Sequence, residues 1–185
     1  MTIKTISHNF LPEDEFKALQ EYCDNNLFDI VSFPEKSFSV LAPPNSIYNY
    51  LHMDGYEMVL SFVRSAYKGF DTNLWIHADN IVQGKRIDIA SVFYINDEDG
   101  VTPNGIAFWE HYSHGIKLPV DCTDDDFDNI LLKDADNRSA WIFKDYISSR
   151  PNRMLTYDAN YFHSKHPAEI TEGIRKVLVT FYTKI

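Results

Sequence analysis

The chain has 185 residues, of which 44% are hydrophobic and 15% aromatic, enough for one globular domain with a buried core. Lys and Arg total 17 against 27 Asp and Glu, and this net charge of −10 disfavours general binding to nucleic acids or anionic membranes. No stretch approaches the roughly 18 apolar residues of a transmembrane helix, and the N-terminus lacks a signal-peptide pattern. With two distant cysteines, Cys23 and Cys122, we expect a reduced, cytoplasmic protein with no membrane partner.

The N-terminal part of the chain predicts two helices and several short strands. A strand is expected over residues 2–6, and Pro12 followed by three acidic residues favours the start of a helix. Residues 28–33 and 38–41 are typical of short strands. Residues 56–68 carry apolar side chains at helical spacing and predict a second helix.

The rest of the chain predicts a β-rich core. Short runs of β-branched and aromatic residues separated by Gly, Asn, Asp and Pro are typical of a sandwich or barrel. These runs cover residues 74–76, 87–95, 106–109, 154–157 and 177–182. An acidic insertion at 121–136 interrupts them, and a short helix is expected over 139–147. The predicted fold class is α+β, mainly β, in a single domain (1–185), with helices and edge strands in 1–70 and the core in 72–185.

Two histidines and one aspartate are the candidate metal ligands. His77 and Asp79 follow a strand-like run, and side chains at i and i+2 of an extended segment point to the same face. His163 follows another such run. Two histidines and one carboxylate form the facial triad of non-haem Fe(II) oxygenases. A surface histidine beside an aspartate is the simpler explanation of the His-X-Asp pattern taken alone.

Arg175 is the candidate anion-binding residue. It begins the predicted last strand, where Val177, Val179 and Phe181 share its face. A guanidinium among apolar side chains is costly to bury without a partner, and its shape suits a bidentate contact with a carboxylate. An arginine that stays solvated at the strand end is the alternative.

The order of these features resembles the prolyl-4-hydroxylase-like group of Fe(II)- and 2-oxoglutarate-dependent oxygenases. The segments that carry the resemblance are residues 9–14, His77 to Asp79, 89–96, 104–111, 152–164 and Arg175. They span most of the chain, and residues 121–150 match least. The resemblance implies a double-stranded β-helix, a jelly-roll or cupin-like core, which two N-terminal helices would buttress here.

The resemblance also implies a metal centre. His77, Asp79 and His163 would hold Fe(II). His166 competes with His163 for the third position, because it lies nine residues before Arg175, a more usual spacing in the family. We favour His163, since it follows the strand and the Tyr-Phe segment directly.

Further roles follow by position. Arg175 would bind the distal carboxylate of 2-oxoglutarate, and Tyr94 would add a hydrogen bond to it. Val177 stands where many relatives have serine or threonine. His111 and Trp109 could line the substrate opening.

The implied reaction is hydroxylation of a C–H bond, with O2 and 2-oxoglutarate as co-substrates and succinate and CO2 as co-products. The expected substrate is peptidyl, with proline a candidate, or a small amino-acid-like molecule, and nucleic acid is disfavoured. Two alternatives stay open: an inactive jelly-roll binding module, and a cupin-like metalloenzyme that does not use 2-oxoglutarate.

Overall fold

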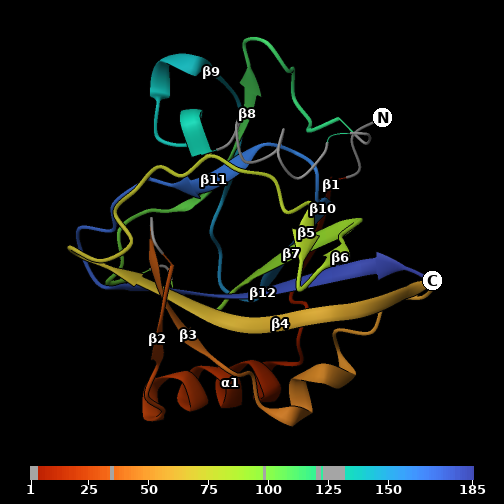
Figure 1. The fold of residues 1–185 in the computed structure, drawn as a ribbon. Coiled ribbons are helices and arrows are strands. Elements are labelled where there is room, and N and C mark those ends of the chain that lie inside the picture. Colours follow the sequence, from red (N-terminus) through yellow and green to blue (C-terminus); the bar gives the residue numbers. More distant parts are fainter. Residues whose placement is uncertain (1–3, 34–35, 98, 120–121, 123–131) are drawn as a thin grey trace.

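A computed structural model describes residues 4–33, 36–97, 99–119, 122 and 132–185, and this part of the chain is mainly β (Figure 1). Its elements are β1 (Lys4–His8), α1 (Glu13–Asn25), β2 (Asp29–Ser32), β3 (Ser37–Leu41), the 3-10 turn η1 (Asn45–Asn49), β4 (Tyr56–Tyr67), β5 (Ile81–Val82), β6 (Lys85–Arg86), β7 (Ile89–Tyr94), β8 (Gly105–His111), the 3-10 turn η2 (Arg138–Ala140), β9 (Trp141–Ser148), β10 (Arg153–Asp158), β11 (His163–His166) and β12 (Ile174–Lys184).

The strands form two main antiparallel sheets. The larger sheet has the strand order β1-β10-β7-β12-β4-β3-β2, and the smaller sheet has the order β11-β8-β9. The short strands β5 and β6 form a separate hairpin. An isolated bridge between His77 and His163 places the segment around His77 beside β11, at the edge of the smaller sheet.

The core consists of three clusters of buried side chains. The largest cluster lies between the two sheets, because its buried side chains come from both. They are Ala90, Val92, Tyr94, Leu155, Tyr157, Val177 and Phe181 from the larger sheet and Ile106 and Phe108 from the smaller one. A second cluster packs the larger sheet against α1, and a third includes Trp109 and Trp141 of the smaller sheet. Figure 1 shows α1 on one side of β4 and β12, with β8, β9 and β11 on the other.

The helix α1 begins directly after Pro12, as the sequence predicts. Proline cannot donate a backbone hydrogen bond, and the acidic residues of the first turn favour the positive end of the helix dipole. Phe16, Leu19 and Cys23 lie three and four residues apart and are buried against the larger sheet. This apolar stripe anchors the helix.

The second predicted N-terminal helix is wrong, because residues 56–67 form the strand β4. Both faces of β4 are partly covered: Val63 joins the cluster under α1, and Phe62 packs against the cluster between the sheets. A strand that is apolar on both faces also satisfies helical spacing, so periodicity alone does not separate the two. Its aromatic and β-branched residues favour a strand, and β12 pairs with it along almost its whole length.

The predicted helix over 139–147 is also wrong. After η2 the segment forms β9, which pairs with β8. The two strands approach closely at Gly105, where an added Cβ atom would lie 2.2 Å from the carbonyl oxygen of Ile147. Only glycine fits that position without moving β9.

The other predicted strands have a mixed outcome. Those near residues 2–6, 28–33, 38–41 and in the later β-rich runs are confirmed as β1, β2, β3, β7, β8, β10 and β12. Residues 74–76 are irregular and form no strand. Of the predicted acidic insertion at 121–136, residues 121 and 123–131 lie outside the described residues.

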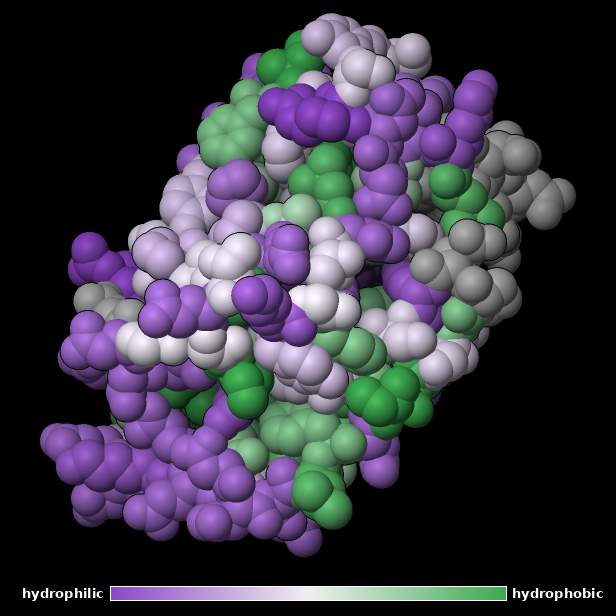
Figure 2. Space-filling view, turned by 90° about the vertical axis from the view of Figure 1, so that its left-hand side faces the viewer, coloured by the Kyte–Doolittle hydropathy of each residue, from purple (hydrophilic) through white to green (hydrophobic). Residues whose placement is uncertain are grey.

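Several apolar side chains are exposed near β2. Four of the exposed large hydrophobic residues lie on β2 or beside it: Leu27, Ile30, Val31 and Phe33. Figure 2 shows one side of the molecule, on which hydrophobic side chains are interspersed with hydrophilic ones. Within the described residues, no helix has the length and hydrophobicity needed to cross a membrane.

Candidate metal centre

Two backbone contacts hold the three candidate ligands together. His77 and His163 exchange N–H···O=C bonds of 3.0 and 2.8 Å, so that the two histidines lie side by side. The backbone N–H of Asp79 donates to the carbonyl of Ala159 at 2.7 Å, which fixes the carboxylate two residues further along. These contacts bring together residues that lie more than eighty positions apart in the sequence.

The donor atoms of the triad fit one metal ion. Nε2 of His77 lies 3.4 Å from Oδ1 of Asp79, and Nε2 of His163 lies 3.2 Å from Oδ2. All three ligand atoms fall within 4.8 Å of one another. Ligands about 2.1 Å from an ion and at right angles to each other would be about 3.0 Å apart, close to what the structure shows. The side chains of His77 and His163 are 24% and 6% exposed, so the cluster is accessible on one side.

The imidazoles are oriented for ligation through Nε2. Nδ1 of His77 lies 2.8 Å from the carbonyl of Trp75, and Nδ1 of His163 lies 2.9 Å from the carbonyl of Tyr161. Each carbonyl accepts an Nδ1–H, which leaves the Nε2 lone pair directed at the triad. This arrangement is typical of metal-binding histidines.

The protonation states also suit a metal. Burial and the neighbouring His163 lower the pKa of His77. Burial alone would raise the pKa of Asp79, but the charge and hydrogen bonds of the two imidazoles outweigh it and hold that pKa well below its usual range. At neutral pH the site therefore offers a carboxylate and a neutral imidazole at these two positions.

Arg175 is buried rather than solvated. It lies on β12 and is 4% exposed, and its Nε donates to Oδ1 of Asn104 at 3.0 Å. Among the described residues no carboxylate pairs with it, and Asn104 is the acceptor found for its five N–H donors. Burial lowers the pKa of Arg175 to about 10, which still leaves it charged at neutral pH. The guanidinium is thus a buried cation with donors to spare for an anion.

Two tyrosines share the space between the sheets with Arg175. Tyr94 is 1% exposed, and its hydroxyl lies 3.5 Å from the carbonyl of Ile147. Tyr157 is equally buried, and its ring centroid lies 4.9 Å from that of His163. Burial raises the pKa of both phenols, and the charge of Arg175 opposes this rise in each. Tyr157 thus contacts a residue of the triad, and the charge of Arg175 also acts on its phenol.

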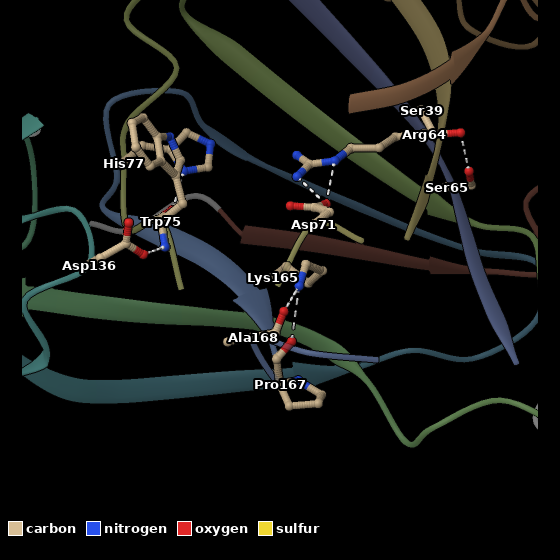
Figure 3. A network of polar contacts seen from close by, with 10 residues as sticks. All are labelled: Ser39, Arg64, Ser65, Asp71, Trp75, His77, Asp136, Lys165, Pro167 and Ala168. Carbon is tan, nitrogen blue, oxygen red and sulfur yellow. Dashed lines mark hydrogen bonds and ion pairs between the residues drawn. The ribbon is translucent and has the colours of Figure 1, made fainter. Parts of the chain in front are cut away.

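Tyr157, Asn104 and Lys165 are three buried residues near the site that the sequence patterns do not indicate. Lys165 lies two residues after His163 on β11, is 9% exposed, and donates to the carbonyls of Pro167 and Ala168 (Figure 3). Burial lowers its pKa to about 8. Because side chains alternate along a strand, Lys165 lies on the same face of β11 as His163, and this relation is visible in the sequence. Only the folded chain shows which groups lie near Lys165.

Three other predicted residues lie outside the triad. His166 ends β11, with its ring 5.4 Å from that of Tyr146, and it is not part of the metal-binding group. Trp109 is 3% exposed, and its indole N–H donates to Ser164 on the face of β11 opposite to His163. His111 is also buried, with Nε2 3.2 Å from Oδ2 of Asp134. Neither Trp109 nor His111 belongs to the group of residues that could hold the metal ion.

The two-sheet fold is similar to that of several solved Fe- and 2-oxoglutarate-dependent enzymes. HygX from Streptomyces hygroscopicus, solved with nickel, 2-oxoglutarate and hygromycin B, has a TM-score of 0.61 at 14% identity, over 99% of this chain and 83% of its own. The carbocyclase SnoK of nogalamycin biosynthesis, a non-haem α-ketoglutarate-dependent enzyme, has a TM-score of 0.63 at 9% identity, over 98% and 79%. A prolyl-4-hydroxylase from Pseudomonas putida has 0.55 at 10% identity, over 100% and 94%.

At these identities the likeness establishes the fold. No protein-family model matches the chain, and no curated protein sequence matches it significantly. The mainly β, jelly-roll-like architecture expected from the sequence is thereby supported.

Proposed function

We propose that the protein is an Fe(II)- and 2-oxoglutarate-dependent dioxygenase that hydroxylates a C–H bond of a small-molecule or peptidyl substrate. The observation that carries the proposal is the convergence of His77, Asp79 and His163 on one potential ion. Arg175 adds a buried cation that pairs with no carboxylate of the described residues. Some of the fold neighbours were solved with nickel or iron together with 2-oxoglutarate, and those solved with hygromycin B or nogalamycin RO favour a small molecule over a peptide.

Each part of the site has a separate task. His77, Asp79 and His163 would hold the metal and leave three coordination positions open. When bound, Fe(II) supplies the oxidising chemistry that converts the substrate, 2-oxoglutarate and O2 to hydroxylated product, succinate and CO2. Arg175 would bind the distal carboxylate of 2-oxoglutarate, and Asn104 would hold the guanidinium in place.

The tyrosines complete the co-substrate site in this proposal. The buried hydroxyls of Tyr94 and Tyr157 would donate hydrogen bonds towards 2-oxoglutarate, since their raised pKa values keep both phenols protonated. The apolar side chains between the sheets would exclude water from the reacting centre.

Spectroscopy of the iron-loaded protein tests the proposal. Under anaerobic conditions, Fe(II) with 2-oxoglutarate should give the weak visible charge-transfer absorption of a chelated keto acid. His77→Ala, Asp79→Ala and His163→Ala should abolish it, whereas His166→Ala should retain it as the matched control. Arg175→Met should weaken 2-oxoglutarate binding at least tenfold, about the effect of losing a charge-assisted contact.

Two outcomes would contradict the proposal. Folded, iron-loaded protein without this absorption would exclude 2-oxoglutarate chelation and favour a metalloenzyme of another kind. Failure to bind Fe(II) at all would favour a binding module.

A further inference from the structure

A small pocket lies next to the candidate metal centre, with Trp75 in its wall. It has a volume of about 200 Å³ and is formed by the start of β3 and the segment that follows β4. We call it the Lys36 pocket, and its lining residues are Lys36, Ser37, Phe38, Gly69, Phe70, Asp71, Thr72, Asn73 and Trp75. Pockets for whole drug-sized ligands measure roughly 300–1,000 Å³, so this one suits a single functional group or a very small molecule.

Lys36 is an unpaired cation in this pocket. Its Nζ lies 3.7 Å from the ring centroid of Trp75 and 4.9 Å from that of Phe38. Within the described residues no carboxylate lies at ion-pair distance from it. Burial and the charge of Arg64 lower the pKa of Lys36 to about 8. A partly desolvated ammonium without a counter-ion is costly, and an anionic ligand would relieve that cost.

The negative charge of Asp71 in the pocket lining is already paired with a neighbouring arginine. The guanidinium of Arg64 pairs with Asp71, as Figure 3 shows, and also lies 4.2 Å from the ring centroid of Phe38. This pair contributes no net charge. Among the described residues that line the pocket, Lys36 is the positive charge without an ion-pair partner, so the pocket suits one anionic group.

Trp75 links the pocket to the metal centre. Its ring forms part of the pocket, while its carbonyl accepts the Nδ1–H of His77 at 2.8 Å. Its own backbone N–H donates to Asp136 at 2.9 Å, which fixes the segment (Figure 3). A group held at Lys36 therefore lies near the candidate ligands.

We propose that the Lys36 pocket binds an anionic group, a carboxylate or a phosphate, on the substrate of the oxygenase. This inference rests on the proposed function, because it assigns the substrate class of that same centre. The anionic group would contact Lys36, and the rest of the molecule would extend past Trp75 towards His77. The pocket is distinct from Arg175, which serves the co-substrate in the proposed function.

Calorimetry with small probes tests the pocket. The full chain is loaded with Ni(II) and saturating 2-oxoglutarate, so that the metal and Arg175 are occupied, and is titrated with benzoate, phenyl phosphate or neutral benzamide. At least one anion should bind at least tenfold more tightly than benzamide. Lys36→Met should reduce anion affinity at least tenfold, Lys36→Arg should retain most of it, and Lys144→Met should leave it unchanged. Lys144 is the matched control, because it pairs with Glu110 elsewhere on the surface.

The three probes and the Lys36 variants distinguish the possible results. Tighter binding of benzoate supports a carboxylate substrate, and tighter binding of phenyl phosphate supports a phosphate. If benzamide binds as tightly as the anions, or if Lys36→Met leaves the affinity for the anions unchanged, the proposal that this pocket binds an anionic group is wrong. Lys36→Gln repeats the test if the methionine variant has a lowered melting temperature. The Fe(II)–2-oxoglutarate absorption should persist in Lys36→Met and Lys36→Gln. If the unsubstituted protein lacks this absorption, the proposed oxygenase function is wrong, and the substrate role of the pocket is wrong with it.

Discussion

Asn104 controls the direction of Arg175, since its side-chain oxygen accepts the Nε–H of the guanidinium. A hydrogen bond to a charged group contributes about 1.5–3 kcal/mol, so Asn104→Ala should weaken 2-oxoglutarate binding roughly tenfold. Asn104→Asp should weaken it further, because the new carboxylate would pair with Arg175 and compete with the keto acid. Titration of the visible Fe(II) absorption with 2-oxoglutarate measures both effects.

Fe(II) affinity should not change in these variants, because Asn104 is no ligand. The exposed Asn26 supplies the control substitution Asn26→Asp. Unaltered 2-oxoglutarate affinity in Asn104→Asp would show that Arg175 does not bind the co-substrate.

Local spacing explains which site residues the sequence could indicate. His77 and Asp79 lie two positions apart on extended backbone, so the sequence alone predicts that their side chains share a face. The position of Arg175 opposite Asn104, and of Lys36 over Trp75, depends on contacts between distant strands and loops. Nothing in the residues near Lys36 indicates a nearby metal centre, so such partners become visible only in the folded chain.

At the scale of elements, α1 stabilises the outer face of the larger sheet. Leu19 is 1% exposed and packs into the cluster beneath the helix, whereas Leu27, just beyond the helix, is 93% exposed. Leu19→Ala should lower the free energy of unfolding by about 2–5 kcal/mol, because it removes buried surface and leaves a cavity. Leu27→Ala should change it by less than about 0.5 kcal/mol. Denaturant titration of both variants measures the difference, and equal effects would mean that α1 is not docked on the sheet.

The two wrong helix predictions have different physical causes. Amphipathic patterns distinguish helices from strands only when one face is polar, and β4 has apolar side chains on both faces. The strands β7, β10 and β12 were predictable because they combine β-branched and aromatic residues with clear turn residues between them. β9 follows an acidic segment with no such boundary, and its strand form depends on pairing with β8.

At the scale of the whole molecule, the proposed co-substrate site spans both sheets. His163 belongs to β11 of the smaller sheet, and Arg175 belongs to β12 of the larger one. A 2-oxoglutarate molecule bound to the metal and to Arg175 would therefore connect the sheets across the interior cluster. Binding to the folded state alone stabilises it, by about 2.7 kcal/mol at a ligand concentration a hundred times the dissociation constant.

This linkage predicts a metal-dependent thermal shift. With Ni(II), which does not depend on anaerobic handling, saturating 2-oxoglutarate should raise the melting temperature by roughly 5–10 °C, given about 2–4 °C per kcal/mol for a domain of this size. Without metal the shift should be much smaller, since only Arg175 and its neighbours would hold the keto acid. His163→Ala should remove the metal-dependent part, and Arg175→Met should remove most of the effect of 2-oxoglutarate while keeping that of Ni(II). Equal shifts with and without metal would mean that the keto acid does not bridge the two sheets.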